Sequence, residues 1–272
     1  MADEGRAESA RSRVGSIPRS QVTLSPRSPD NGWPKSSPSG GLERFRSSRE
    51  FARHMTSVAS LDRLIRSRHL LTHPFYVDWA RGTVPIETLR EYAGQYYRFE
   101  CSFPRYVAGA YARVPDPESR RVLLSNLIDE EGRDPTHPEL WLRFAESIGL
   151  SRRRAQFALP IRATRRLLST YERHTLNGDA SSALGALYAY ESIFPEVAAE
   201  KSRGLRTHYG VRSARAHEFF RVHTRADVEH SAAERRLLRD ELRRSATNGS
   251  VAQRAVEQTI DAWWSFLDAF TG

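Results

Sequence analysis

Two histidines and an aspartate lie at helical spacing in the stretch His223-Thr224-Arg225-Ala226-Asp227-Val228-Glu229-His230. Positions i, i+4 and i+7 share one face of an α-helix, so His223, Asp227 and His230 would be stacked over two turns. Two imidazoles and a carboxylate on one face are half of a dinuclear non-haem iron site, or a complete facial triad. The alternative is a polar helix face in contact with water. The choice depends on whether other helices supply matching ligands.

A second pair of candidate ligands lies near the end of the predicted helix 118–131. Glu130 continues the apolar stripe that begins at Leu123, but Glu131 continues a neighbouring stripe equally well, so the pattern leaves both glutamates open. His137 follows Glu130 by seven residues, beyond a proline-containing corner that could fold its imidazole back. The alternative role for His137 is to cap the next helix.

Glu191 is a further candidate, because it shares a helical face with Leu187, Tyr190 and Phe194 in the predicted helix 183–209. A lone carboxylate on such a face would lose much of its hydration energy unless it were paired with an arginine or bound to a metal. With the two groups above, the sequence offers three carboxylates and three imidazoles. Helical bundles hold pairs of iron or manganese ions with mixed sets of this kind.

The segments that must position these residues are all predicted to be helices. From residue 57 onward apolar residues recur every three or four positions, without strand-like alternation or an internal repeat. The principal helices are predicted over 86–112 with a kink at Pro104, 118–131, 137–149, 183–209 with an interruption at Pro195, 214–244 ending before Asn248-Gly249, and 251–270. Shorter helices are predicted within 61–79 and 151–175. We therefore expect an all-α bundle of seven to eight helices.

Composition divides the 272-residue chain into a tail over 1–55 and a helical domain over 56–272. The first segment is rich in Ser, Pro and Arg and poor in apolar residues, which predicts disorder. The net charge of +9 arises from arginines spread among acidic residues, without a basic run, so no nucleic-acid partner is expected. A single cysteine, Cys101, excludes an internal disulfide and indicates the cytoplasm. No apolar stretch reaches the ~18 residues of a membrane span, so no membrane partner is expected.

Five parts of the chain carry a resemblance to a known family. They are Thr72-His73-Pro74-Phe75-Tyr76-Val77, Asn126-Leu127-Ile128-Asp129-Glu130-Glu131 with His137, Leu187-Tyr188-Ala189-Tyr190-Glu191-Ser192, Glu200-Lys201-Ser202-Arg203-Gly204-Leu205, and the stretch from His223 to His230. In their order and separations, residues 60–272 resemble the CADD-like members of the haem-oxygenase-like diiron oxidases. That helical fold is shared with thiaminase II and the PQQ-synthesis oxidase.

The resemblance implies a ligand set and a metal. It places six ligands to Fe2 or Mn/Fe at Glu130, His137, Glu191, His223, Asp227 and His230, and so prefers Glu130 to Glu131. It also implies O2 as co-substrate and an external reductant. One departure is Phe219, which stands where some relatives carry Tyr.

The resemblance further implies a role in folate supply, in which p-aminobenzoate is made from a tyrosine of the protein itself with a lysine as amino donor. By position these residues are Tyr76 and Lys201, with Tyr92 and Tyr190 nearby. A phenol already has the para-substituted ring, and a buried lysine can shift toward the neutral, nucleophilic amine. The alternative for the tyrosines is core packing. The alternative for Lys201 is a surface lysine, although the chain contains only two lysines.

Three other functions stay open at this point. The same metal site could serve an oxidase or oxygenase that acts on an external amine, amino acid or fatty acid. A thiaminase-type hydrolase would have to use Cys101 as its nucleophile. A non-enzymatic interaction protein would not depend on the six ligands. The sequence leaves the oligomeric state open, with a homodimer as one candidate.

Overall fold

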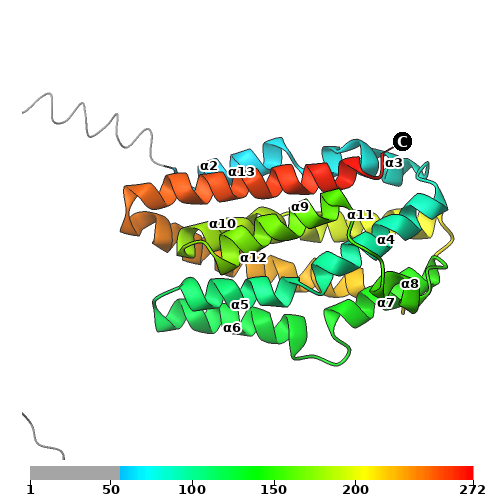
Figure 1. Ribbon diagram of the computed structural model, residues 1–272, viewed down its shortest axis with the longest axis horizontal. Coiled ribbons are helices and arrows are strands. Elements are labelled where there is room, and N and C mark those ends of the chain that lie inside the picture. Colours follow the sequence, from blue (N-terminus) through cyan, green and yellow to red (C-terminus); the bar gives the residue numbers. More distant parts are fainter. Residues whose placement is uncertain (1–55, 272) are drawn as a thin grey trace, which may run out of the picture. The chain divides into compact units, whose positions relative to one another are not determined.

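The computed structural model of the protein describes residues 56–271 (Figure 1). The expected disordered tail over residues 1–55 lies outside the described residues. Within the described residues the structure is helical and contains no strand, which confirms the predicted fold class. The elements are α2 (Val58–Ser67), η1 (Leu70–Thr72), α3 (Pro74–Arg81), α4 (Ile86–Glu100), α5 (Phe103–Arg113), α6 (Pro117–Glu131), α7 (His137–Ser147), α8 (Arg152–Gln156), α9 (Arg162–Tyr171), η2 (Glu172–Leu176), α10 (Ala180–Glu191), α11 (Phe194–His208), α12 (Glu218–Arg244) and α13 (Ala246–Asp268).

Residues 56–271 form twelve α-helices, more than the seven to eight expected. Two long predicted helices are each divided, and short helices such as α3 and α8 account for the rest of the difference. The segment 86–112 is α4 and α5, and Pro104 lies in the first turn of α5 instead of a kink. The segment 183–209 is α10 and α11, with Pro195 in the first turn of α11. Proline is tolerated in a first turn because no amide hydrogen is needed there. Both breaks leave a buried glutamate, Glu100 or Glu191, as the last residue of a helix.

The break between α12 and α13 also differs from the prediction. It falls at Ser245, whose hydroxyl accepts a hydrogen bond from the amide of Thr247 and caps α13. Asn248 lies inside the first turn of α13 and donates its side-chain amide to the backbone oxygen of Glu241. The Asn-Gly pair therefore belongs to the start of a helix, since a capping serine sets the boundary three residues earlier.

The helix α10 lies at the centre of the bundle, and all of its residues are buried. It packs against α13, α12 and α5, and Figure 1 shows α13 running alongside it. Small residues allow this close approach: a Cβ atom on Gly185 would lie 2.8 Å from the backbone oxygen of Ala252 in α13. A helix that is apolar on every face is stable only when it is covered in this way. Its carboxyl end carries Tyr190 and Glu191 into the interior.

Among the described residues, no helix is long and apolar enough to cross a membrane. The core of the bundle is dominated by aromatic rings, which come from α3, α4, α7, α11, α12 and α13. Six of these rings are almost completely buried, namely Trp79, Tyr92, Tyr96, Trp141, Phe194 and Phe219.

Candidate metal centre

Two groups of possible metal ligands lie in the interior and share one carboxylate. Glu100, Glu130, His137 and His223 each place a ligand atom within 4.8 Å of the others. Glu130 forms a second such group with Asp227 and His230. All six side chains are buried. The arrangement offers two neighbouring positions for metal ions, with the carboxylate of Glu130 common to both.

The helix α12 supplies three of these side chains from one face. His223, Asp227 and His230 are buried, as the i, i+4, i+7 spacing predicts. Nδ1 of His223 donates to the backbone oxygen of Phe219 at 2.8 Å, which leaves Nε2 directed at the cluster, 4.0 Å from Oε1 of Glu100. Nε2 of His230 lies 3.1 Å from Oδ2 of Asp129. Hydrogen bonds of this type fix the tautomer of a ligating histidine.

The corner between α6 and α7 brings the next two residues together. Glu130 is 2% exposed, whereas Glu131 lies on the exposed side of the helix. His137 is the first residue of α7, after the capping residue Thr136, and its Nδ1 lies 2.8 Å from Oε2 of Glu130. Of the two glutamates that the pattern left open, the one in the cluster is Glu130.

Glu191 is buried as predicted, but it lies outside both ligand groups at the 4.8 Å spacing. Its two carboxylate oxygens each accept a hydrogen bond from Nδ2 of Asn126 at 3.3 Å. The pKa of Glu191 is raised to about 8, first by burial and then by the charges of Asp227 and Glu130, while His230 opposes this. The charges of the cluster therefore influence the pKa of Glu191, although its carboxylate belongs to neither ligand group.

Two buried carboxylates in this region were missed in the sequence. Glu100 follows Tyr96 by four residues and precedes Phe103 by three, so it lies on the apolar, aromatic-rich face of the predicted helix 86–112. Glu234 continues the α12 stripe one turn beyond His230 and is 1% exposed. The stripe rule that selected Glu130 would have selected both.

Burial and mutual repulsion raise the pKa values of two carboxylates of this cluster. Burial, then the charge of Glu130, raises the pKa of Glu100 to about 8. Burial raises the pKa of Asp227 to about 6 against the attraction of His230. Burial lowers the pKa of His137, but the neighbouring Glu130 outweighs it and brings the pKa to about 9. Nearby positive charge therefore stabilises the ionised carboxylates, and a protonated His137 or a bound cation can supply it.

The cluster fits metal cations on two counts. Buried polar atoms stand without hydrogen-bond partners among the described residues, namely Nε2 of His137, Nδ1 of His230 and both carboxylate oxygens of Glu234. Buried polar groups ordinarily find partners, so these atoms call for a bound cation or water. Imidazole nitrogens mixed with carboxylate oxygens form a donor set that suits iron and manganese.

The four residues predicted to carry the chemistry lie together beside the cluster. Lys201 is fully buried, and its Nζ lies 5.8 Å from the ring centroid of Tyr76, 5.3 Å from that of Tyr92 and 4.4 Å from that of Tyr96. The hydroxyls of Tyr76 and Tyr92 are 3.2 Å apart. Those of Tyr96 and Tyr190 are 2.6 Å apart. Tyr96 was not singled out in the sequence, although its ring is the nearest of these three to the amine.

A small cavity connects the tyrosines with the ligands. Its volume is about 10 Å³, and its lining includes Tyr96 and Tyr190 together with Glu100, His223 and Asp227. Phe219 lies beside it, with its ring centroid 4.1 Å from that of His223. Cys101, which a hydrolase of the thiaminase type would need as its nucleophile, is exposed at the end of α4.

The fold and the buried ligand cluster define a helical, metal-dependent redox enzyme. The chain belongs to the family of iron-containing redox enzymes, whose pattern matches residues 90–264. It is 36% identical over 217 residues to a 4-aminobenzoate synthase of Chlamydia pneumoniae, in an alignment covering 79% of this chain and 96% of that protein. The protein is thus a metal-binding oxidoreductase, and the resemblance to the CADD-like proteins is confirmed.

Solved structures support the fold. A protein of Shewanella denitrificans with a haem-oxygenase-like fold superposes with a TM-score of 0.65 at 16% identity, covering 84% of this chain and 91% of that one. A CADD-like protein of Nostoc punctiforme superposes with a TM-score of 0.61 at 17% identity, covering 85% and 97%. The predicted haem-oxygenase-like bundle is therefore confirmed.

Proposed function

We propose that this protein makes 4-aminobenzoate from its own Tyr76, with the amine of Lys201 as the nitrogen source. The reaction takes place at a dinuclear Fe2 or Mn/Fe centre and consumes O2 together with electrons from an external reductant. Similarity to 4-aminobenzoate synthases supports the product. The placement of a lysine among tyrosines beside a ligand cluster supports the use of the chain's own residues.

The proposed ligands divide between two metal positions. Glu100, His137 and His223 would hold the first ion and Asp227 and His230 the second, with Glu130 present in both groups. Glu191 would join the second position only by moving closer than the structure places it. Metal ions bound there would supply the oxidising chemistry by reacting with O2. The chain's part is to hold six or seven donors in a closed, water-poor interior, where Asp129 orients His230 and the backbone oxygen of Phe219 orients His223.

The observation that carries the proposal is the environment of Lys201. Its side chain is 0% exposed, and Nζ has no hydrogen-bond partner among the described residues. Burial lowers the pKa of this amine well below its usual value of 10.5, with Glu100 as the opposing charge. This shift favours the neutral amine, which keeps the lone pair that bond formation requires. A lysine that served only as a surface cation would not be enclosed by aromatic rings.

The product defines which bonds must change. 4-Aminobenzoate has one carbon outside its ring, so the Cα–Cβ bond of Tyr76 breaks and Cβ becomes the carboxylate carbon. Nζ of Lys201 bonds to the ring in place of the phenol oxygen, which leaves as water, so the Nζ–Cε bond also breaks and Cε becomes an aldehyde carbon. Cα of Tyr76 takes up a hydrogen in place of the lost side chain. These changes are a net oxidation of both side chains, and O2 is the oxidant and the source of the added oxygen. The shared hydrogen bond with Tyr92 holds the phenol in place, and proximity takes the role of substrate binding.

The cavity next to the ligands favours an internal substrate over an external one. At about 10 Å³ it holds about one water molecule. An added amine, amino acid or fatty acid would require the aromatic core to open. The ring of Tyr76 is already inside and 2% exposed.

Isotope labelling tests the proposal directly. Full-length protein with ring-13C tyrosine and 15N lysine, given Fe(II), O2 and a reductant, should release doubly labelled 4-aminobenzoate, at most about one per chain. Tyr76→Phe should abolish release and keep the metal, and Lys201→Arg, which cannot supply a neutral amine, should abolish amination. Tyr111→Phe, a partly exposed tyrosine of α5, is the matched control. Unlabelled product, or many turnovers on an added substrate, would replace this proposal with an external-substrate oxidase.

The proposal includes a cytoplasmic location, which the single cysteine supports, and no nucleic-acid or membrane partner. A homodimer is the candidate assembly. Light scattering on the full-length protein at several concentrations distinguishes it from a monomer.

A further inference from the structure

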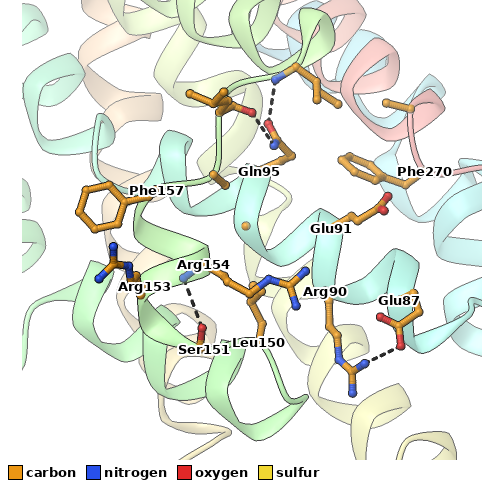
Figure 2. A pocket seen from close by; sticks show the side chains of 15 residues that line it. Glu87, Arg90, Glu91, Gln95, Leu150, Ser151, Arg153, Arg154, Phe157 and Phe270 are labelled. Atoms are coloured by element: carbon orange, nitrogen blue, oxygen red, sulfur yellow. Dashed lines mark hydrogen bonds and ion pairs between the residues drawn. The ribbon is translucent and has the colours of Figure 1, made fainter.

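A large open pocket lies between α4 and α8 (Figure 2). Its volume is about 800 Å³. One wall is the exposed face of α4, the opposite wall is α8 with the segment 157–161, and the turn after α13 closes one side. None of the residues proposed for the chemistry lines this pocket, so the function proposed above does not explain it.

The wall formed by residues 157–161 is fixed in place by side chains of α4. Nε2 of Gln95 donates to the backbone oxygen of Leu159 at 2.9 Å, and its Oε1 accepts from the amide of Ile161 at 3.1 Å. Nε of Arg98 donates to the backbone oxygen of Ala158 at 2.7 Å. The apolar side chains of Phe157 and Leu159 are nevertheless 72% and 83% exposed. A firmly held wall with exposed apolar groups is typical of a surface that receives a ligand.

Among residues 56–271, the pocket lining contains three charged groups that are available to a ligand, Arg153, Arg154 and Glu91, and the last two are opposite in sign. Arg90 is engaged, because it pairs with Glu87 at 2.5 Å and donates to the backbone oxygen of Ile148. Neither the guanidinium of Arg154 nor the carboxylate of Glu91 has an ion-pair or hydrogen-bond partner among residues 56–271. Figure 2 shows Arg154 extending into the pocket from α8, and the Glu91 carboxylate on the side of Phe270.

Phe270 links the pocket to the tyrosines. It lies in the turn that follows α13, lines the pocket, and is 6% exposed. On its inner side the ring packs perpendicular to Tyr92, with centroids 5.5 Å apart. The hydroxyl of Tyr92 in turn shares a hydrogen bond with that of Tyr76. A single ring therefore stands between the pocket and the tyrosine pair.

We propose that this pocket is a release site for a para-amino aromatic carboxylate, which under the function proposed above is 4-aminobenzoate. Arg154 binds the carboxylate, Glu91 accepts a hydrogen bond from the aromatic amine, and the ring packs on Phe270. Two opposite charges beside an aromatic floor match a ligand with an acceptor at one end and a donor at the other. The ligand reaches the pocket when the ring of Phe270 turns away from Tyr92.

Equilibrium dialysis with radiolabelled 4-aminobenzoate tests the site. Full-length protein is used without a reductant, so that no product is formed during the measurement. We expect one saturable site, with weaker binding of benzoate, which lacks the amine, and of aniline, which lacks the carboxylate. Arg154→Ala should weaken binding about tenfold, because it removes a charge-assisted hydrogen bond. Phe270→Leu should weaken it about two- to tenfold through loss of the ring contact. Arg162→Ala, an exposed arginine outside the pocket, should have no effect.

The dialysis result is independent of the labelling result. Absence of saturable binding, or binding that Arg154→Ala and Glu91→Gln leave unchanged, would overturn the release site even if the product carried tyrosine label. Binding that depends on Arg154 would establish the site even if the ring carbons came from an external compound. Thermal unfolding of each variant verifies that lost binding is not lost folding.

Discussion

Nδ1 of His137 lies 2.8 Å from Oε2 of Glu130, although the two residues belong to different helices. The chain leaves α6 after Glu131 and begins α7 at His137 itself, so the corner between them closes this contact. The fold therefore brings a carboxylate and an imidazole of the proposed metal site together, and such positioning by the scaffold is what a metal site requires.

Replacing Asp227 by alanine is expected to remove metal without unfolding the protein. Even outer-shell partners of a metal change its affinity by roughly 10- to 100-fold, so loss of a proposed ligand should weaken binding by at least about 100-fold. Helix content should persist, because apolar packing carries most of the stability. Elemental analysis, O2 consumption and circular dichroism measure the three quantities.

The control for this variant is Asp240→Ala, an exposed aspartate on the same helix. It should keep both metal and activity. An Asp227→Ala protein with full metal content and O2 consumption would show that the carboxylate is not a ligand.

The stability of the metal-free protein is expected to fall as the pH rises from about 6.5 to 8. Burial raises the pKa of Glu100 and Glu191 from 4.5 to about 8. The folded protein therefore holds protons that the unfolded chain has already released in this range, so rising pH favours unfolding by about 1.4 kcal/mol per pH unit for each such proton. The raised pKa values of His137 and His230 act in the same direction above about 6.5. The lowered pKa of Lys201 opposes this change with one proton.

Calorimetry of metal-free and metal-loaded protein at several pH values within this range tests the effect. Because bound cations take the place of the protons, the free energy of unfolding of the metal-loaded protein should change little over this range. The difference in free energy of unfolding between the loaded and the metal-free protein should therefore grow with pH. Parallel pH profiles for the two forms would contradict a cluster of protonated carboxylates.

Lys201→Met is expected to stabilise the protein while abolishing amination. Methionine has a similar length and no donor, so it removes a buried, unpaired amine whose desolvation costs about 1–3 kcal/mol. Thermal unfolding should therefore show a higher midpoint than for the parent protein, and Lys201→Arg, which places a larger cation in the same space, should show a lower one. A loss of stability in the methionine variant would mean that the amine has a partner that stabilises the fold.

Gly204→Ala is expected to disturb the tyrosine region and leave metal content unchanged. A Cβ atom at this position would lie 2.5 Å from Nε1 and 2.6 Å from Cδ1 of Trp79, which is fully buried and donates to the backbone oxygen of Lys201 at 3.3 Å. Relief of the clash should cost about 1–3 kcal/mol and lower the yield of product. Gly94→Ala, where the nearest atom lies at 3.4 Å, is the control and should be neutral or slightly stabilising.

The sequence predicts the face of a helix better than the place where the helix ends. His223, Asp227 and His230 are buried together because their spacing leaves one helical face to share. The neighbouring stripe of α6, which Glu131 continues, contains Leu124 and Ile128, and these are 41% and 54% exposed. Two adjacent stripes on α6 were equally apolar, and only the neighbouring helices decide which one is covered.

The residues that were missed differ in how far the sequence could have revealed them. Glu100 lies on the apolar face of the predicted helix 86–112, so the local pattern is sufficient to find it. The nearness of Lys201 to Tyr96 joins α11 to α4, a pairing that no local pattern encodes. Periodicity fixes which side of a helix is buried, but not which partner it meets.

The use of Lys201 as nitrogen donor, in a chain with only two lysines, makes reacted and unreacted molecules distinguishable by proteolysis. The sequence contains one other lysine, Lys35, so a lysine-specific protease cuts the denatured, unreacted chain into three pieces. A molecule that has given up the nitrogen of Lys201 has lost one of the two cleavage sites and yields only two. The peptide pattern of each polypeptide therefore shows whether its Lys201 has lost the nitrogen. Mass spectrometry of cell extracts can count reacted and unreacted copies without any assay of the product.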